Sequence, residues 1–409
     1  MKLINMLLGL SLFVALQSYG QVEGCTDPLA INYNAEATEN DGSCMYENET
    51  VSPESSVVLP DELTETSGLI VIDDRVLTHN DNTDTNLYEV NSETGVVEEV
   101  YPIPGVTNID WEEITQDEDN IYIGDFGNNA NGNRTDLKIL KVNKADLFNN
   151  EAQVEIINFS YSDQTDFTPT GGNNTDFDCE AFIAFEDNIY LFTKQWQSKE
   201  TSVYMLPKIP GTYSAELQDT HSVEGLITGA TYLEDKKLVV LSGYDSSFLP
   251  FFYLLYDYDE NDFFTGNKRK IQVSTSFHQV EGIATSNGTD YYLSNERIQH
   301  PTLGTIPQKL HYYDLSVYLE NYLQGTAGTE SFKANNVKVY PNPATGTITV
   351  TMPEHIQNTG YTIYDMTGRV ILKDTFSKTT SIDISVLQPA TYIIKVDSKN
   401  SKPLVIIKE

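Results

Sequence analysis

Apolar and polar residues alternate in short runs along most of the chain, and turn residues separate these runs. Residues 110–125 show the pattern most clearly, because two apolar runs flank the turn Glu118-Asp119-Asn120. Residues 178–191 repeat it around Glu186-Asp187-Asn188. Alternation with a period of two, interrupted by Asn and Asp at turns, is typical of β-hairpins. The pattern therefore predicts an all-β protein built from repeats.

The same pattern starts five times, and the start points share one register. The spacings between successive starts are 45, 68, 48 and 53 residues, for units that begin at Ser67, Glu112, Glu180, Thr228 and Glu281. A four-stranded propeller blade takes about 40–50 residues. We therefore predict a five-bladed β-propeller over residues 57–322. A six-bladed propeller, with an irregular blade in 127–177 or 244–278, is the alternative.

The strands of the second unit can be predicted one by one, and the fifth unit lacks a strand. The second unit is expected to place its strands at 112–117, 120–125, 137–142 and 153–160. The fifth unit shows only three strands, the last ending at Leu315. Val57-Val58-Leu59 is expected to supply the missing outer strand, which would close the ring and remove an open edge.

The last part of the chain has its own alternation and its own charge. After a linker at 323–332, residues 333–409 contain short strands separated by turns, which predict a small Ig-like β-sandwich. This segment carries 9 Lys and Arg against 6 Asp and Glu, a net charge of +3, whereas the whole chain carries −35. The change of sign marks a domain boundary.

Motifs in this sandwich resemble a known secretion signal. Val339-Tyr340-Pro341-Asn342-Pro343 and the Gly368-Arg369 pair are similar to the motifs of the type IX secretion C-terminal sorting domain, type A. The resemblance implies that Tyr340, Pro341, Asn342, Pro343, Gly368 and Arg369 form a sorting signal. It also implies type IX secretion machinery and its sortase as partners. The expected location is outside a Gram-negative cell, either secreted or attached to the outer surface.

The N-terminal part is predicted to be a signal peptide followed by a module that contains two cysteines. Residues 1–20 have a Lys near the start and an apolar run too short to span a bilayer, which predicts a signal peptide. A lipoprotein cut before Cys25 is the weaker alternative. Residues 21–44 contain Cys25 and Cys44, which should form a disulfide in an exported protein. Residues 45–56 are expected to be a linker, and Cys179 a buried free thiol.

The cysteine module also resembles a known type of unit. Its ends, Gly-Cys-Thr-Asp-Pro and Asn-Asp-Gly-Ser-Cys, are similar to short modules of secreted bacterial surface proteins. The resemblance allows calcium binding by Asp27, Asn40 and Asp41. We favour the simpler interpretation, in which these side chains cap turns.

Composition excludes some classes of function. A net charge of −35 argues against binding nucleic acid or an anionic membrane by charge. No apolar stretch after the leader reaches the length of a transmembrane helix, so no integral membrane segment is expected in the mature protein. The six His show no spacing typical of a zinc site.

Propeller geometry brings equivalent residues of the blades to one channel mouth. Carboxylates there would suit Ca²⁺, which takes six to eight oxygen ligands; the metal candidates are Glu112, Glu180, Glu281, Asp125 and Asp81. A small-molecule or glycan ligand could be held by Asn80, Lys194, Trp196, Tyr244, Asn295 and Arg297. The structural alternative is that each Glu pairs with backbone N–H groups, Lys194 or Arg297. Trp111 and Trp196 are more simply explained by packing than by a sugar platform.

The repeats also resemble, loosely, propellers of the esterase-like phytase and SdiA-regulated type. The resemblance rests on the Glu-Gly and Ser-Gly strand starts and on Gly124-Asp125-Phe126-Gly127. It transfers no catalytic signature. Two classes of function follow: an exported calcium-dependent ligand-binding module, or alternatively a calcium-dependent phosphoesterase or lactonase-type hydrolase.

Overall fold

A computed structural model describes residues 21–409, except residues 83, 276–277, 301–303, 326–337, 341, 352–358, 366–368, 377–378, 397–403 and 409. The chain divides into two compact units, Met1–Gln324 and Gly325–Glu409. Each unit is all-β apart from short helical segments. The predicted signal peptide, residues 1–20, lies outside the described residues.

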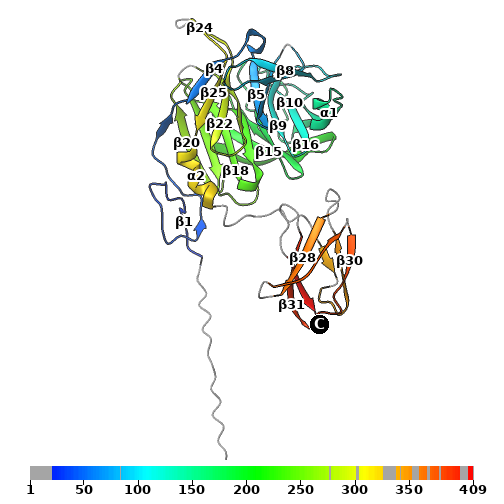
Figure 1. The fold of residues 1–409 in the computed structure, drawn as a ribbon. Helices are drawn as coiled ribbons and strands as arrows, with labels where there is room; N and C mark the ends of the chain where they lie inside the picture. The colour runs from blue at the N-terminus through cyan, green and yellow to red at the C-terminus, as the bar shows by residue number, and fades with distance from the viewer. Residues whose placement is uncertain are drawn as a thin grey trace, which may run out of the picture. The chain divides into compact units, whose positions relative to one another are not determined.

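The first unit is a β-propeller (Figure 1) whose described blade strands run as five antiparallel meanders, one sheet to a blade. The sheets of the second and third blades are joined into one of eight strands by a parallel pair, Ile157–Tyr161 with Gly211–Ala215. The first three sheets contain β5 (Thr66–Ile72), β6 (Arg75–Asn80), β7 (Asn86–Val90) and β8 (Val97–Pro102); β9 (Trp111–Gln116), β10 (Asn120–Asp125), β11 (Lys138–Asn143) and β12 (Val154–Tyr161); and β13 (Cys179–Phe185), β14 (Asn188–Thr193), β15 (Glu200–Pro207) and β16 (Gly211–Ser222). The other two contain β17 (Leu226–Leu233), β18 (Leu238–Tyr244), β19 (Pro250–Tyr256) and β20 (Asn267–Val273); and β21 (Val280–Thr285), β22 (Asp290–Asn295) and β25 (Lys309–Asp314).

The first strand of each sheet lies innermost, and these inner strands form a ring. β5 contacts β9, β9 contacts β13, β13 contacts β17, β17 contacts β21, and β21 contacts β5. Large apolar side chains fill each junction between neighbouring sheets: Trp111 and Ile70 between the first two, and Phe192 and Phe251 between the third and fourth. The core of the propeller is thus a set of inter-blade layers around a channel.

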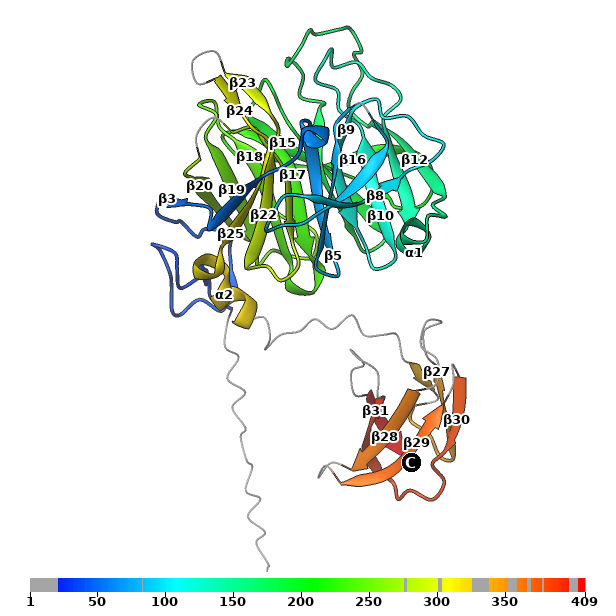
Figure 2. The same cartoon turned by 45° about the horizontal axis from the view of Figure 1, so that its top comes forward.

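The closing strand lies where the sequence predicted it. β4 (Ser55–Val58) pairs antiparallel with β25, with Val57 opposite Leu310. In Figure 2 the blue β4 segment lies beside the yellow strands of the last blade. The ring is therefore fastened by joining the N-terminal part of the chain to its last blade, which covers the outer edge of β25.

Residues 45–56 are not a plain linker, which corrects the prediction. They hold β3 (Glu49–Val51), which pairs parallel with β20, and the first half of β4. The composition of Glu, Ser and Asn gave no strand signal, because these short edge strands are held by the blades beside them rather than by their own apolar residues. Further elements that were not predicted are α1 (Lys144–Phe148), α2 (Ser316–Gly325), η1 (Asp61–Leu63), η2 (Glu234–Lys236) and the hairpin β23 (Ile298–His300) and β24 (Gly304–Ile306).

The cysteine module packs on the fourth blade. Cys25 and Cys44 form a disulfide and Cys179 is a buried free thiol, so both predictions are confirmed. Two short parallel strands, β1 (Glu23–Gly24) and β2 (Glu39–Asn40), organise the module. The Asp27 carboxylate accepts hydrogen bonds from the backbone N–H of Leu29 and from the hydroxyl of Tyr256, at 2.9 and 2.6 Å. These contacts favour the turn-capping interpretation of Asp27 over calcium binding.

The second unit is a two-sheet sandwich, as predicted. One sheet has the order β26-β27-β30 and the other β29-β28-β31-β32. The strands are β26 (Lys338–Tyr340), β27 (Thr347–Thr351), β28 (Thr359–Asp365), β29 (Val370–Phe376), β30 (Thr379–Asp383), β31 (Ala390–Val396) and β32 (Leu404–Lys408). Ile348, Ile363, Ile382 and Ile394 form its buried centre.

Candidate functional site at the channel mouth

Every inner strand of the propeller carries a β-bulge at the repeat position that the sequence singled out. The ladder between the first two strands of a blade skips Glu112, Glu180 and Thr228, and it is likewise irregular at Ser67 and Glu281. A bulge leaves a residue unpaired and redirects its side chain. The shared sequence register therefore corresponds to a shared backbone irregularity, which points side chains toward the mouth of the channel.

Four of these residues, Ser67, Glu112, Glu180 and Glu281, line a pocket of about 210 Å³. Thr228 is outside the lining, and its hydroxyl donates to the Val280 carbonyl at 2.6 Å. Its lining comes from loops and strand ends of all five blades and is almost entirely polar. It consists of Glu65, Thr66, Ser67, Asp81, Asp110, Glu112, Asn129, Asn173, Glu180, Lys194, Trp196, Tyr244, Gln279, Glu281 and Glu296. The structure thus brings together seven of the predicted site residues: Glu112, Glu180, Glu281, Asp81, Lys194, Trp196 and Tyr244.

Lys194 is the only basic residue of this lining, against seven carboxyl groups. Its ammonium lies 2.6 Å from Glu180 Oε2, and both side chains are buried. Burial alone would lower the pKa of Lys194, but the surrounding acids, Glu180 above all, raise the pKa well above its usual value. The ammonium also lies 4.9 Å from the Trp196 ring centre and 5.4 Å from that of Tyr244. Glu180 is therefore paired with Lys194, as the structural alternative expected.

Glu112 and Glu281 are different, since the described residues give neither side chain a hydrogen bond or an ion pair. Glu112 is only 7% exposed and Glu281 only 8%. Burial, and then the negative charge of Glu180, raises the pKa of Glu112 well above its usual value. Burial raises the pKa of Glu281 to about 8, against the opposing effect of Lys194. Burial of a carboxyl group without a partner disfavours its charged form, which is the physical cause of both raised pKa values.

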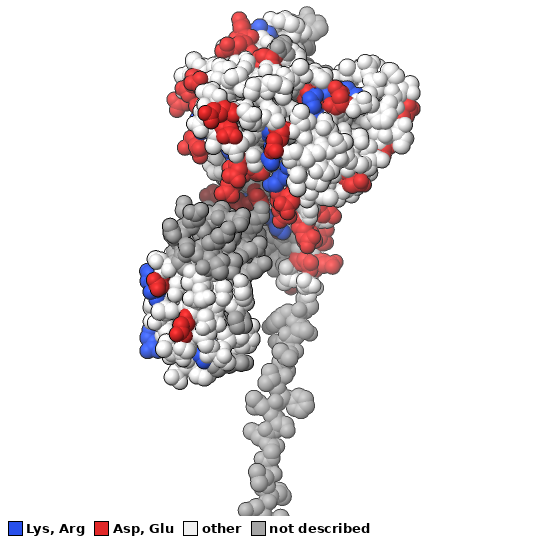
Figure 3. Space-filling view, turned by 90° about the vertical axis from the view of Figure 1, so that its right-hand side faces the viewer, with Lys and Arg blue, Asp and Glu red and all other residues white. Residues whose placement is uncertain are grey.

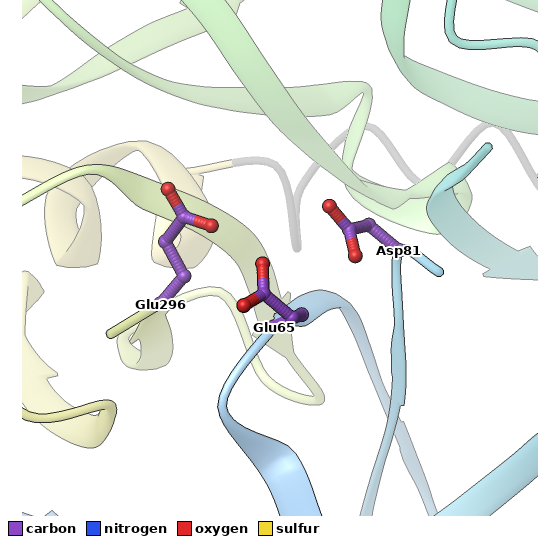
Figure 4. A group of neighbouring side chains, drawn as sticks. All are labelled: Glu65, Asp81 and Glu296. Carbon is purple, nitrogen blue, oxygen red and sulfur yellow. The ribbon is translucent and has the colours of Figure 1, made fainter. Parts of the chain in front are cut away.

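A second group of carboxylates lies at the side of the pocket formed by the first and fifth blades. Glu65, Asp81 and Glu296 each present an oxygen atom, and these atoms lie within 4.8 Å of one another. Figure 4 shows the three carboxyl groups facing a common space, although they come from three separate chain segments. Burial and then Glu65 raise the pKa of Asp81 and of Glu296 to about 7 each. This spacing would suit one divalent cation.

Four predicted site residues lie outside the pocket lining. Asp125 is fully buried and forms ion pairs with Arg134 at 2.9 Å and Lys138 at 2.8 Å. Arg297 pairs with Asp61 and donates to Gln308 Oε1. Asn80 donates to the Glu62 carbonyl, and Asn295 donates to the Pro307 carbonyl. Neighbouring groups thus engage a side-chain group of each of these residues, although Asn80 Oδ1 is buried without a hydrogen-bond partner among the described residues.

The sequence analysis missed several pocket residues, although a signal for some of them was present. Glu65, Asp110 and Gln279 each lie two positions before the bulged residue of their blade, namely Ser67, Glu112 and Glu281. Each stands one position before the inner strand of its blade, so the position recurs in three blades, whereas its equivalent in the third blade, Asp178, is buried outside the lining. Asn129 belongs to the loop after the second strand of its blade, which the repeat places at the mouth, but it was not among the predicted ligand residues. Asn173 comes from an inserted loop that has no counterpart in the repeat.

The two Trp residues have separate roles. Trp111 is fully buried between the first two blades, as the packing interpretation expected. Trp196 lines the pocket instead, and its indole N–H donates to Asp178 Oδ2 at 2.8 Å. That hydrogen bond fixes the indole at the rim, where one part of the ring remains accessible.

The sorting motif is described only in part. Pro341 and Gly368 lie outside the described residues. Tyr340 and Pro343 are exposed, the Asn342 side chain accepts a hydrogen bond from the backbone N–H of Ile407 at 2.8 Å, and Arg369 pairs with Asp365 at 3.0 Å. The motif thus lies beside the closing strand β32.

Comparison with known proteins identifies the second unit. Residues 338–408 match the family model of the secretion system C-terminal sorting domain. No curated protein matches the sequence. The match confirms the predicted resemblance, and it makes this an exported protein that is delivered to the cell surface or beyond.

Solved structures resemble the chain only distantly. PorZ, a surface component of the type IX secretion system of Porphyromonas gingivalis, is 12% identical with a TM-score of 0.30; the match covers 83% of this chain and 44% of PorZ. Myxococcus xanthus glutaminyl cyclase is 11% identical with a TM-score of 0.40, over 65% and 99% of the two chains. An exo-β-1,3-galactanase of Phanerochaete chrysosporium is 9% identical with a TM-score of 0.40, over 91% and 98%. Matches this weak carry no argument about function.

Among the described residues, no helix has the length and apolar character needed to cross a membrane.

On the face in Figure 3, Asp and Glu side chains are spread widely over the described surface, with Lys and Arg between them. The acidic groups at the channel mouth are therefore distinguished by their burial and convergence, not by charge alone.

Proposed function

We propose that this protein is an exported binding module, which holds a divalent cation of the Ca²⁺ type at the channel mouth and uses it to bind a small polar ligand. The type IX machinery and its sortase would deliver it across the outer membrane of a Gram-negative cell through residues 333–409. The sorting-domain match supports export, and the pocket supports binding.

The observation that carries the cation proposal is a pair of buried carboxyl groups, Glu112 and Glu281, that have no partner in the described part of the chain. They lie in the same pocket as the Glu65, Asp81 and Glu296 cluster. Like charges held close together raise one another's pKa, and a cation removes that cost. Oxygen ligands from carboxylates are what Ca²⁺ prefers. The cluster differs from the expected set, since Glu65 and Glu296 join Asp81 while Asp125 is engaged by Arg134 and Lys138.

A hydrolase of the phosphoester type has weaker support. Such chemistry needs cationic groups for the phosphate. Lys194 is paired with Glu180, and Arg134 and Arg297 lie outside the pocket lining. A binding role needs no group beyond those already in the pocket.

Thermal unfolding with and without calcium tests the proposal. Bound cation should stabilise the propeller by about 2.7 kcal/mol at a hundredfold excess over its dissociation constant, which corresponds to a rise in Tm of roughly 5–10 °C. The double variant Asp81→Asn, Glu296→Gln should lose most of this rise. Glu118→Gln removes the charge of an exposed residue in the β9–β10 turn and serves as the matched control. An equal rise in Tm for the double variant, or none for the wild type, would refute the cation site.

A further inference from the structure

Two inserted loops contribute amide groups to the pocket. The segment after β10 and the segment after β12 are joined to each other, with the Asn173 N–H donating to the Asn129 carbonyl at 2.8 Å and the Thr170 N–H donating to the Asn131 carbonyl at 2.9 Å. The Asn128 side chain adds a hydrogen bond to the Phe177 carbonyl at 2.8 Å. The loops are thus fixed, and they place Asn129 and Asn173 in the pocket lining.

The amide side chains of Asn129 and Asn173 are not used by the fold. Within the described part of the chain, neither amide group has a hydrogen bond, whereas the neighbouring Asn128 and Asn174 side chains are both bonded to backbone. An amide offers one acceptor and two donors. Two such groups on a fixed rim can recognise a ligand that carries both kinds of hydrogen-bonding group.

Charge restricts the class of ligand. The single ammonium of the pocket is already paired with Glu180, so an anionic group would meet seven carboxyl groups and no unpaired cation other than a bound metal. A hydroxyl group, in contrast, can donate to a carboxylate and can also coordinate Ca²⁺ through its oxygen. The apolar side of such a ligand would find the accessible part of the Trp196 indole, which Asp178 holds in place.

We propose that the ligand is a neutral polyhydroxylated molecule of the saccharide class, recognised by Asn129 and Asn173 together with the cation and Trp196. This inference deepens the proposed function and rests on it. The cavity of about 210 Å³ is below the usual 300–1,000 Å³ of drug-sized sites. One sugar unit, free or at the end of a chain, is therefore the expected occupant.

The two Trp residues allow a direct test. Trp111 is buried between blades, so a ligand-dependent change in intrinsic fluorescence reports Trp196. Purified full-length protein is titrated in calcium with glucose, galactose, mannose, fucose and N-acetylglucosamine, and separately with inorganic phosphate. At least one sugar should give a saturable change, phosphate should give none, and Trp196→Phe should abolish the signal.

Variants of the loops complete the test. Asn129→Ala with Asn173→Ala should weaken sugar binding at least tenfold, while Asn131→Ala, an exposed residue of the same loop outside the lining, should not. Isothermal titration of the same samples provides a readout independent of Trp196. Saturable binding of phosphate but of no sugar, or sugar binding that the double variant leaves unchanged, would overturn the inference. The calcium-dependent Tm of the wild-type sample is measured in parallel, so that a failure of the cation site is recognised separately.

Discussion

Glu112 and Glu113 are neighbours on β9, yet they occupy opposite kinds of environment. Glu112 points into the mouth pocket and has no hydrogen-bond partner among the described residues. The carboxylate of Glu113 accepts backbone N–H groups from Ile114 and Ala230 at 2.9 Å each and from Leu69 at 3.3 Å. Since Ala230 lies on β17, which is not adjacent to β9 in the ring, this single carboxylate links inner strands across the centre of the propeller.

Glycine makes the position of Glu113 possible. A Cβ atom at Gly68 would lie 2.4 Å from the Glu113 carboxylate, and one at Gly229 would lie 2.9 Å from it. Both distances are too short for non-bonded atoms. The Ser67-Gly68 and Thr228-Gly229 starts of the first and fourth blades therefore leave room for an acid from the second blade.

The comparison separates structural acids from acids available for binding. Burial raises the pKa of both Glu112 and Glu113. Only Glu113 regains hydrogen bonds that offset the lost hydration. Asp125 and Asp81 form a second such pair near the end of the second strand of their blades, because Asp125 is the last residue of β10 and Asp81 directly follows β6. Asp125 is held by Arg134 and Lys138, whereas Asp81 faces Glu65 and Glu296. An acid in the repeat register is thus a binding candidate only where the fold leaves it unsatisfied.

The largest expected effect comes from removing the acid at the centre of the ring. Glu113 Oε1 accepts from Leu69 and Ile114, and Oε2 accepts from Ala230. Glu113→Gln replaces one of these oxygens with an NH₂ donor, which leaves the backbone N–H on that side unpaired and the new NH₂ group facing it. We expect a loss of about 3 kcal/mol or more in the free energy of unfolding, because each buried unsatisfied group costs about 1–3 kcal/mol. Glu112→Gln is the matched control and should leave stability unchanged or higher. Chemical denaturation measures both, and equal losses in the two variants would contradict the comparison.

A smaller loss is expected at the buried ion pair. Asp125→Asn removes one of the two carboxylates that pair with Arg134, which keeps Asp136 at 3.1 Å, and it removes the carboxylate partner of Lys138. We expect a cost of about 2–3 kcal/mol, below the 3–5 kcal/mol typical of fully buried pairs, because both basic side chains reach solvent. Asp81→Asn removes a mutually repelling acid and should not destabilise the protein. Only Asp81→Asn should reduce the calcium-dependent rise in Tm; the reverse outcome would make Asp125 the ligand.

The carboxyl groups at the channel mouth should govern how the stability of the protein depends on pH. The folded-state pKa of Asp81 and Glu296 is about 7 and that of Glu281 about 8, above the ordinary values of 3.8 and 4.5. The folded protein therefore binds more protons than the unfolded chain between about pH 4 and 8, so stability without cation falls as the pH rises through this range. We expect Tm in chelator to decline from pH 5 to pH 8 and calcium to suppress the decline. The same decline with calcium present would argue against a cation at these groups.

Removing the sorting domain should have the smallest effect on the partnered acids of the propeller and on the acids of the mouth pocket. Residues 1–324 and 325–409 are separate compact units. Deletion of residues 333–409 should leave the propeller's Tm and its calcium response unchanged, while the protein should no longer reach the cell surface. Fractionation of cells that express the two forms measures the second effect, and surface display of the shortened protein would contradict it.

The sequence by itself determined the repeat, the strand register and the export signal. The alternation around Glu118-Asp119-Asn120 located the strands of the second unit to within one or two residues, and Val57-Val58 identified the closing strand. These features are local: turn chemistry, apolar period and short motifs are properties of neighbouring residues. The disulfide between Cys25 and Cys44 followed in the same way from the expected export.

Only the tertiary structure decided which acids are partnered. Glu112 and Glu113 are indistinguishable by residue type, and their difference depends on Leu69 and Ala230, which lie 44 and 117 positions from Glu113. The cluster of Glu65, Asp81 and Glu296 likewise joins the first blade to the last, a proximity that exists only once the ring closes. Whether a buried carboxyl group has hydrogen-bond partners depends on the residues around it in space. The sequence could therefore predict that the candidate acids lie at one channel mouth, but only the fold shows which of them lack partners.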